Sequence, residues 1–279
     1  MEQKNPIVSV LMPTYNRKAL LERAVQSVLS QSFDNFELIV INDASTDGTK
    51  KFLDDLSKID ARVISIHNES NNYPDISKNL NVGLEGARGI YIARLDDDDY
   101  WCDPGKIKEQ VDFFMSHSDH VIVGGGTIVV DEKDKERFKY FKLEGDSAIR
   151  DKALFANPFT HSTVMFRRDI AREVGGYGNF KNAEDWELWL KIGTRGKFYN
   201  FQKYYVRYLS TDQSKTFLFK RSQSREILRI ISAHKKEYPH FFMAYCLNLT
   251  QYCFSLFPAG LRAALYNSLS RAKRTIFSS

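Results

Sequence analysis

The stretch Gly89-Ile90-Tyr91-Ile92-Ala93-Arg94-Leu95-Asp96-Asp97-Asp98-Asp99 joins an apolar run to four consecutive aspartates. The apolar run has the composition of a buried strand, so the four carboxylates are expected together at its carboxyl end, which is where ligands bind in open α/β sheets. Like charges this close repel one another, and a chain keeps such a cluster where a cation lies among the carboxylates. Hard oxygen ligands on one loop suit Mg²⁺ or Mn²⁺ that also binds substrate phosphates. The stretch therefore predicts a metal-bridged nucleotide site, and the alternative is a solvated acidic turn.

Strands and helices alternate on the amino-terminal side of the aspartates. Apolar runs predict strands at 7–12, 36–41 and 63–66. Amphipathic segments predict one helix at 18–31, a second that follows the loop 43–48 and ends at about residue 57, and a third at 76–87. This order favours a doubly wound, largely parallel α/β sheet. The first turn reads Pro13-Thr14-Tyr15-Asn16-Arg17 and has no GxGxxG, so NAD or FAD binding is not expected.

The second half of the chain is less regular. Residues 121–130 predict two short strands around three glycines, and a charged, mobile stretch follows to about residue 151. A strand is expected at 162–166, a short helix at 169–174 and an apolar helix from residue 182.

Two carboxylates, Glu184 and Asp185, open this last helix. Helix capping is one explanation, because acidic residues are favoured at a helix start. The flanking Trp186, Leu188 and Trp189 should partly bury the pair, however, and burial can tune a carboxylate towards general-base catalysis.

Composition places few limits on function. The chain has 279 residues, of which 43% are hydrophobic and 27% charged, enough for one large domain or a domain with an appendage. The three cysteines and six histidines show no CxxC or HExxH spacing, so neither a disulfide framework nor a zinc site is expected. The start of the chain runs directly into the first strand, which leaves no room for a signal peptide and predicts a cytoplasmic protein.

Positive charge is concentrated at the carboxyl end. The net charge is +5, yet residues 215–279 hold 11 Lys and Arg against two acidic residues and carry +9, so the remainder carries −4. A basic helix is expected at 222–237, and 239–257 is aromatic and apolar apart from a polar stripe of Asn248, Gln251 and Ser255, which argues against a spanning helix.

Beyond residue 260 an apolar helical face with a basic rim predicts that 239–279 contacts a membrane surface. The alternative is a helical appendage that folds onto the main domain or onto a partner. Nucleic acid is not expected, because the aromatics cluster with aliphatic residues rather than alternating with basic ones.

Four motifs, in this order, resemble the family 2 inverting glycosyltransferases over residues 6–214: Pro13-Thr14-Tyr15-Asn16-Arg17, Asn42-Asp43-Ala44-Ser45-Thr46-Asp47-Gly48, Leu95-Asp96-Asp97-Asp98-Asp99 and Glu184-Asp185-Trp186-Glu187-Leu188-Trp189. The resemblance implies a GT-A fold, a doubly wound mixed sheet. It also implies a catalytic domain at 1–214, with a nucleotide-binding half (1–103) and an acceptor-side half (104–214). Residues 215–279 then form a basic, membrane-associating helical tail.

The resemblance also assigns roles to residues. The implied nucleotide-sugar ligands are Pro13, Thr14, Tyr15, Arg17, Asp43, Lys78, Asp96, Asp97 and Arg207. Asp96 and Asp98 would bind Mn²⁺ or Mg²⁺, although the run of four leaves the register open, so that Asp97 and Asp99 could share that work. Asp185 matches the catalytic base, and His161, Glu184 and Trp186 are expected on the acceptor side. Lys78 stands where the family commonly has Arg, which changes the expected contact with the diphosphate.

The expected activity is metal-dependent, inverting transfer of a sugar from a nucleotide sugar, expected to be a UDP-sugar, to a hydroxyl of a lipid-linked glycan. Members of the resembled family often act in bacterial O-antigen or capsule assembly, which predicts that the protein is cytoplasmic and attached to the inner face of the cell membrane. The sequence does not decide whether the protein forms a homo-oligomer. One alternative is a catalytically inactive, membrane-associated scaffold that binds nucleotide sugars. A sugar nucleotidyltransferase would need a glycine-rich loop after the first strand, and Pro13-Thr14-Tyr15-Asn16 does not supply it.

Overall fold

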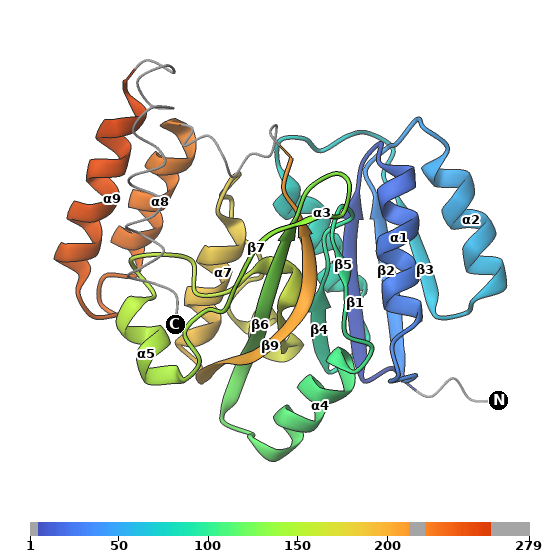
Figure 1. The fold of residues 1–279 in the computed structure, drawn as a ribbon, viewed down its shortest axis with the longest axis horizontal. Coiled ribbons are helices and arrows are strands. Elements are labelled where there is room, and N and C mark those ends of the chain that lie inside the picture. Colours follow the sequence, from blue (N-terminus) through green and yellow to red (C-terminus); the bar gives the residue numbers. More distant parts are fainter. Residues whose placement is uncertain (1–4, 212–220, 258–279) are drawn as a thin grey trace.

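A computed structural model describes residues 5–211 and 221–257 of the chain. Its centre is a nine-stranded sheet with the order β3-β2-β1-β4-β8-β6-β9-β5, and β7 pairs with β6 at the side (Figure 1). The strands are β1 (Val8–Thr14), β2 (Phe36–Asn42), β3 (Val63–His67), β4 (Tyr91–Arg94), β5 (Tyr100–Trp101), β6 (His120–Val130), β7 (Glu136–Tyr140), β8 (Met165–Arg167) and β9 (Lys197–Leu209).

The first four strands run parallel, as predicted. β8 is antiparallel to both β4 and β6, which makes the sheet mixed. The helices are α1 (Lys18–Leu29), α2 (Thr49–Ile59), α3 (Ile76–Gly86), α4 (Lys106–Ser116), α5 (Asp146–Lys152), α6 (Arg168–Glu173), α7 (Glu184–Gly193), α8 (Arg221–Ala233) and α9 (Phe241–Ser255).

Two hydrophobic cores lie on opposite faces of the sheet, because side chains alternate along each strand. In β1, Val10 and Met12 belong to one core, which also holds α1 and α4, whereas Leu11 belongs to the other, with α3 and α7. Burial on both faces explains why the parallel strands are almost wholly apolar.

Three predictions for the second half were wrong. Residues 120–130 form one strand rather than two, because Gly124–Gly126 allow neighbouring side chains to cross it; a Cβ at Gly125 would lie 2.2 Å from the Tyr205 ring. The charged stretch to residue 151 contains β7 and α5, since β7 pairs with β6 and α5 packs beside β9. The strand expected at 162–166 begins as a 3-10 turn, His161–Thr163, and β8 covers only Met165–Arg167.

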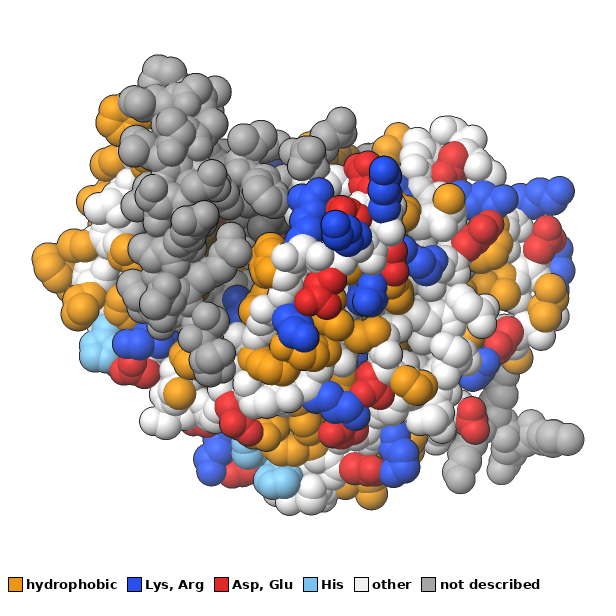
Figure 2. Space-filling view, viewed as in Figure 1, with side chains coloured by type: hydrophobic (Ala, Val, Ile, Leu, Met, Phe, Trp, Pro, Cys, Tyr) orange, Lys and Arg blue, Asp and Glu red, His pale blue; other side chains and the backbone are white. Residues whose placement is uncertain are grey.

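The described part of the tail is an α8–α9 hairpin that packs against the acceptor-side half. Ile230 and Ile231 of α8 and Ala244 of α9 join the core around α7, and the Tyr238 hydroxyl donates to the Leu190 carbonyl (2.8 Å). Hydrophobic side chains gather at the left edge of the molecule, over α9 (Figure 2). The helix predicted beyond residue 260 lies outside the described residues, and the domain boundary at residue 214 stays a prediction.

No helix within 5–211 and 221–257 is both long enough and apolar enough to cross a membrane.

Candidate active site

The loops that follow β1, β2 and β4 meet at the carboxyl edge of the sheet. Pro13 and Thr14 end β1, and Arg17, three residues further on, donates Nη1 to Asp97 (3.0 Å) and Asp98 (2.8 Å). Asp43 follows β2, and its carboxylate accepts hydrogen bonds from the Asn68 side chain (2.8 Å) and the Asn72 backbone (3.0 Å). Tyr15 is exposed beside them. The structure thus brings together the polar residues predicted on these three loops.

The four aspartates have different environments, and this bears on the register of the motif. Asp99 is fully buried and accepts hydrogen bonds from the Ser162 hydroxyl (2.5 Å) and the Leu209 backbone (2.9 Å). The Asp97 side chain is only 7% exposed, whereas those of Asp96 and Asp98 are 30% and 29% exposed. The two carboxylates open to a ligand are therefore Asp96 and Asp98.

These carboxylates fit a divalent cation. Burial, followed by the negative charge of Asp97, raises the pKa of Asp98 to about 6, and a bound cation would relieve the repulsion between these carboxylates. In the described ranges, no group of three or more His, Cys, Asp or Glu side chains is arranged to hold a metal ion. Two carboxylates suit Mg²⁺ or Mn²⁺, which take their remaining ligands from substrate phosphates and water.

Beneath the cluster lies a buried cation, Arg94. Its side chain is fully buried and donates to Asp96 (2.7 Å), to His161 Nε2 (2.9 Å) and to the Leu11 carbonyl. Its bond to Asp96 pairs this buried arginine with the first aspartate of the cluster.

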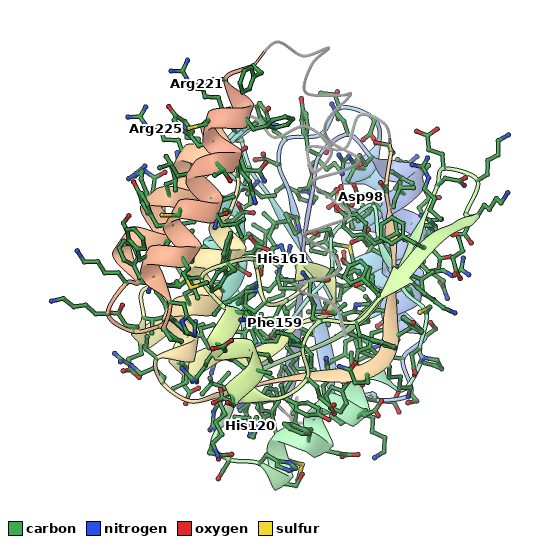
Figure 3. All side chains as sticks on the ribbon, turned by 60° about the vertical axis from the view of Figure 1, so that its left-hand side comes forward. Asp98, His120, Phe159, His161, Arg221 and Arg225 are labelled. Carbon is green, nitrogen blue, oxygen red and sulfur yellow. The ribbon has the colours of Figure 1, made fainter. Side chains whose placement is uncertain are left out.

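His161 lies near the centre of the molecule, with Asp98 above it in the view of Figure 3. Burial, followed by the charge of Arg94, lowers its pKa to about 4, against the opposing effects of Asp96 and Asp185. The imidazole is therefore neutral near pH 7. Since Nε2 accepts from Arg94, the proton is assigned to Nδ1, which lies 3.9 Å from an Asp96 oxygen.

Asp185 is held at the first turn of α7 by two hydrogen bonds. Its Oδ2 accepts from the Asn157 side-chain amide (2.7 Å), and its Oδ1 accepts from the Trp186 backbone (2.7 Å). Lys142 in turn donates to the Asn157 carbonyl (3.1 Å). Sequence reasoning assigned no role to Asn157 or Lys142, because both lie in segments without a recognisable motif.

Three predicted residues lie apart from this centre. Trp186 is buried and donates its indole N–H to the Ala153 carbonyl (2.9 Å), so it packs in the core. Lys78 is mostly exposed, 3.8 Å from Asp75, and Arg207 pairs with Asp134 (3.0 Å) in the turn between β6 and β7.

Glu184 makes stability depend on pH. Burial, followed by the charge of Asp185, raises the pKa of Glu184 to about 8, so the folded protein keeps this carboxyl protonated where the unfolded chain has already lost the proton. Stability is therefore lost as the pH rises from about 4.5 to 8. Glu184→Gln does not titrate, so we expect its stability relative to the parent protein to rise over that window, by at most about 5 kcal/mol, the equivalent of a pKa shift from 4.5 to about 8. Urea unfolding of both proteins at pH 5 and pH 8.5 checks this, and a difference that does not change with pH contradicts it.

Comparison with known proteins gives a consistent result. Residues 9–175 match the family model described as glycosyl transferase family 2. EpsE of Bacillus subtilis, assigned as a glycosyltransferase, is 35% identical over 71% of both chains. The O-antigen biosynthesis glycosyltransferase WbnJ of Escherichia coli is 30% identical over 67% of this chain and 71% of its own.

The fold has counterparts among solved structures. The crystal structure of Staphylococcus aureus TarS 1–349 in complex with UDP-GlcNAc superposes with a TM-score of 0.69 over 89% of this chain and 73% of that one, at 20% identity. The predicted GT-A type of mixed α/β sheet is thereby confirmed.

Proposed function

This chain belongs to glycosyl transferase family 2, and we propose that it transfers a sugar from a UDP-sugar to a hydroxyl of a glycan acceptor with inversion at the anomeric carbon. One observation carries the proposal: His161 Nδ1 lies 3.9 Å from Asp96, and the charges of both Asp96 and Asp185 act on its pKa, so the donor-side carboxylate and the candidate base lie near one imidazole. A nucleotide sugar with its diphosphate at Asp96 and Asp98 would then direct its anomeric carbon towards Asp185.

The residues of the chain divide the chemistry between them. Arg17 and the loops after β1 and β2 bind the nucleotide, and Asp96 and Asp98 hold Mg²⁺ or Mn²⁺. Such an ion, when bound, stabilises the charge that develops on the diphosphate leaving group. Asp185 accepts the proton of the acceptor hydroxyl as that oxygen attacks from the face opposite the leaving group. A single displacement of this kind inverts the anomeric configuration.

The acceptor we propose is a lipid-linked glycan in cell-surface polysaccharide synthesis, as the relationship to an O-antigen enzyme suggests. The enzyme would then work from the cytoplasmic face of the membrane, and α9 supports this. Two residues of the predicted polar stripe, Asn248 and Ser255, are buried and face the interior of the domain. The outward face carries apolar side chains, among them Phe242 (76% exposed), Met243, Leu249, Leu256 and Phe257. An outward apolar face on a helix beside basic segments suits a membrane interface.

The donor and its metal are tested directly by nucleotide release. We expect the protein to release UDP from one UDP-sugar of a panel in the presence of Mn²⁺ or Mg²⁺, and to lose this activity in EDTA, because the leaving-group charge is then unscreened. GDP- and dTDP-sugars serve as controls. If nucleotide sugars bind but no combination of donor, metal and cell-derived glycan gives transfer, the catalytically inactive scaffold replaces the transferase.

Membrane attachment is tested on the outward face of α9. We expect the double variant Phe242→Glu/Leu249→Glu to lose binding to anionic liposomes, because two charges would enter the apolar interface. Flotation measures binding, and nucleotide release from the donor should stay unchanged. Thr250→Glu, exposed on the same helix, is the matched control. Equal flotation of all three proteins would remove α9 as the attachment site.

A further inference from the structure

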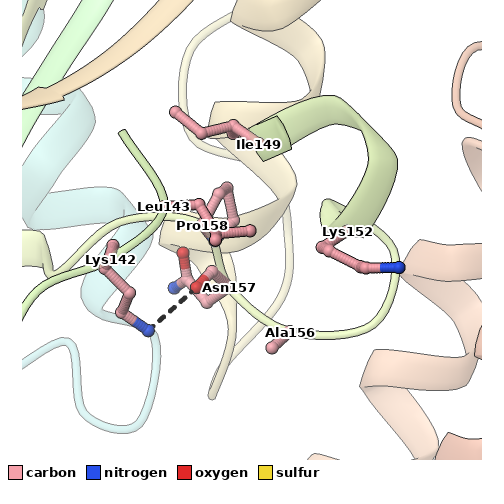
Figure 4. A pocket seen from close by; sticks show the side chains of 7 residues that line it. All are labelled: Lys142, Leu143, Ile149, Lys152, Ala156, Asn157 and Pro158. Carbon is pink, nitrogen blue, oxygen red and sulfur yellow. Dashed lines mark hydrogen bonds between the residues drawn. The ribbon is translucent and has the colours of Figure 1, made fainter. Parts of the chain in front are cut away.

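A small pocket of about 20 Å³, with room for about one water-sized group, lies beside α5 and includes Asn157, which bonds to the candidate base (Figure 4). Leu143, Ile149 and Pro158 form apolar walls, and Lys142, Lys152 and Asn157 supply the polar groups. None of the residues that line the pocket is acidic. The pocket therefore has two cationic groups and no carboxylate of its own.

Lys142 is the cation in this pocket that lacks a counter-ion. Its ammonium group donates to the Asn157 carbonyl (3.1 Å), and within the ranges that the structure describes it forms no ion pair. Burial lowers its pKa to about 8, while the charge of Asp185 acts in the opposite direction. Lys152 differs, because it pairs with Asp151 at 2.7 Å. A half-buried charge without an ion-pair partner is costly, and an anion in the pocket would lower that cost.

Asn157 connects this lysine to the base. Its carbonyl accepts from Lys142, and its side-chain amide donates to Asp185 (2.7 Å), so one residue separates the ammonium group from the carboxylate. An anion on Lys142 would consequently lie on the acceptor side of Asp185. A hydroxyl on the same sugar, or on its neighbour, could then reach the carboxylate.

We propose that Lys142 binds an anionic group of the acceptor, a carboxylate or a phosphate, so that the enzyme selects acidic glycans. This inference rests on the proposed function, because it assumes that the acceptor meets Asp185. The small pocket admits the anionic group rather than the body of the sugar, and the ammonium group of Lys142 distinguishes an acidic glycan from a neutral one. Charge recognition in a partly desolvated pocket is strong, because water competes poorly there.

Binding of small anions tests the proposal without turnover. Protein labelled with ¹³C at the lysine Cε is titrated at pH 8 with glucuronate, with glycerol 1-phosphate and with neutral methyl glucoside, and Lys142→Arg identifies the Lys142 signal by its loss. We expect one of the two anions to shift that signal towards the protonated form, and methyl glucoside to leave it in place. A shift with glucuronate indicates that the site recognises a carboxylate, and a shift with glycerol 1-phosphate indicates that it recognises a phosphate.

Variants separate recognition from a structural role. Ligand-observed NMR should show binding of the active anion weakened about tenfold or more in Lys142→Met, and retained in Lys142→Arg, which keeps the charge. Lys152→Met, in the same pocket but already paired with Asp151, is the matched control and should bind nearly as the parent does. The proposal is overturned if neither anion moves the Lys142 signal, or if Lys142→Met binds as tightly as the parent protein.

Failure here is distinct from failure of the proposed function. Nucleotide release from UDP-sugars reports on the loops around Asp96 and Asp98 and does not need the pocket at Lys142. Donor turnover without anion binding therefore refutes only the acidic acceptor.

Discussion

Asp185→Asn is expected to slow sugar transfer by about 10²- to 10⁴-fold, the usual contribution of a positioned general base. The amide keeps the size of the carboxylate and leaves one oxygen to accept from Asn157 or Trp186, so the fold should survive. It cannot take the proton of the acceptor hydroxyl, however. Rates of transfer with saturating donor, compared with the affinity for the nucleotide, measure the effect, and the affinity should change little.

Asp169→Asn is the matched control for this experiment. Asp169 is an exposed aspartate near the start of a helix, α6, and its neutralisation should leave transfer intact. Near-full transfer by a folded Asp185→Asn protein would contradict the assignment of Asp185 as the base.

Asp98→Asn is expected to lower metal-activated transfer by about 10²- to 10³-fold, because a lost carboxylate ligand removes several kcal/mol of charge stabilisation. The metal concentration that gives half-maximal rate should rise at least about tenfold, since each 1.4 kcal/mol lost from binding costs a factor of ten. Protons compete with the metal for a carboxylate whose pKa is about 6 in the metal-free protein, so metal binding by the parent should weaken as the pH falls through 6.

A comparison with Asp99→Asn decides the register of the motif. Asp99 accepts from Ser162 and Leu209, so its replacement should mainly lower the unfolding temperature and leave the metal requirement of the remaining folded protein unchanged. Asp112→Asn, on the exposed side of α4, is the control for a general loss of negative charge. The opposite result, in which Asp99→Asn and not Asp98→Asn raises the metal requirement, would shift the ligand pair.

The parts of the fold that the sequence predicted are those encoded by local patterns. The parallel strands β1 to β4 are short apolar runs separated by amphipathic helices, and each such pattern reports burial directly. The aspartate cluster and Asp185 were found because both lie next to such elements, at a strand end and a helix start. The match to family 2 confirmed the family that these motifs suggested.

The rest depends on contacts between distant residues. The role of Asp99 follows from the Leu209 backbone, 110 residues away in the sequence, and nothing in a run of four identical residues distinguishes it from its neighbours. The polar stripe of α9 is visible in the sequence, but only its packing against the core shows that Asn248 and Ser255 face inward. The possible role of Lys142 depends on its contact with Asn157, which the sequence does not predict.

The buried guanidinium of Arg94 limits how this chain can diverge. It bonds to Asp96, to His161 and to the Leu11 backbone, and it has no exposed surface; loss of Asp96 leaves an uncompensated charge inside the protein, and loss of His161 leaves a guanidinium N–H without its acceptor. A substitution at position 94, 96 or 161 is therefore tolerated only together with changes at the other two. Across an alignment of relatives these three positions should covary, and a lineage that replaces the arginine should replace its carboxylate and imidazole partners as well.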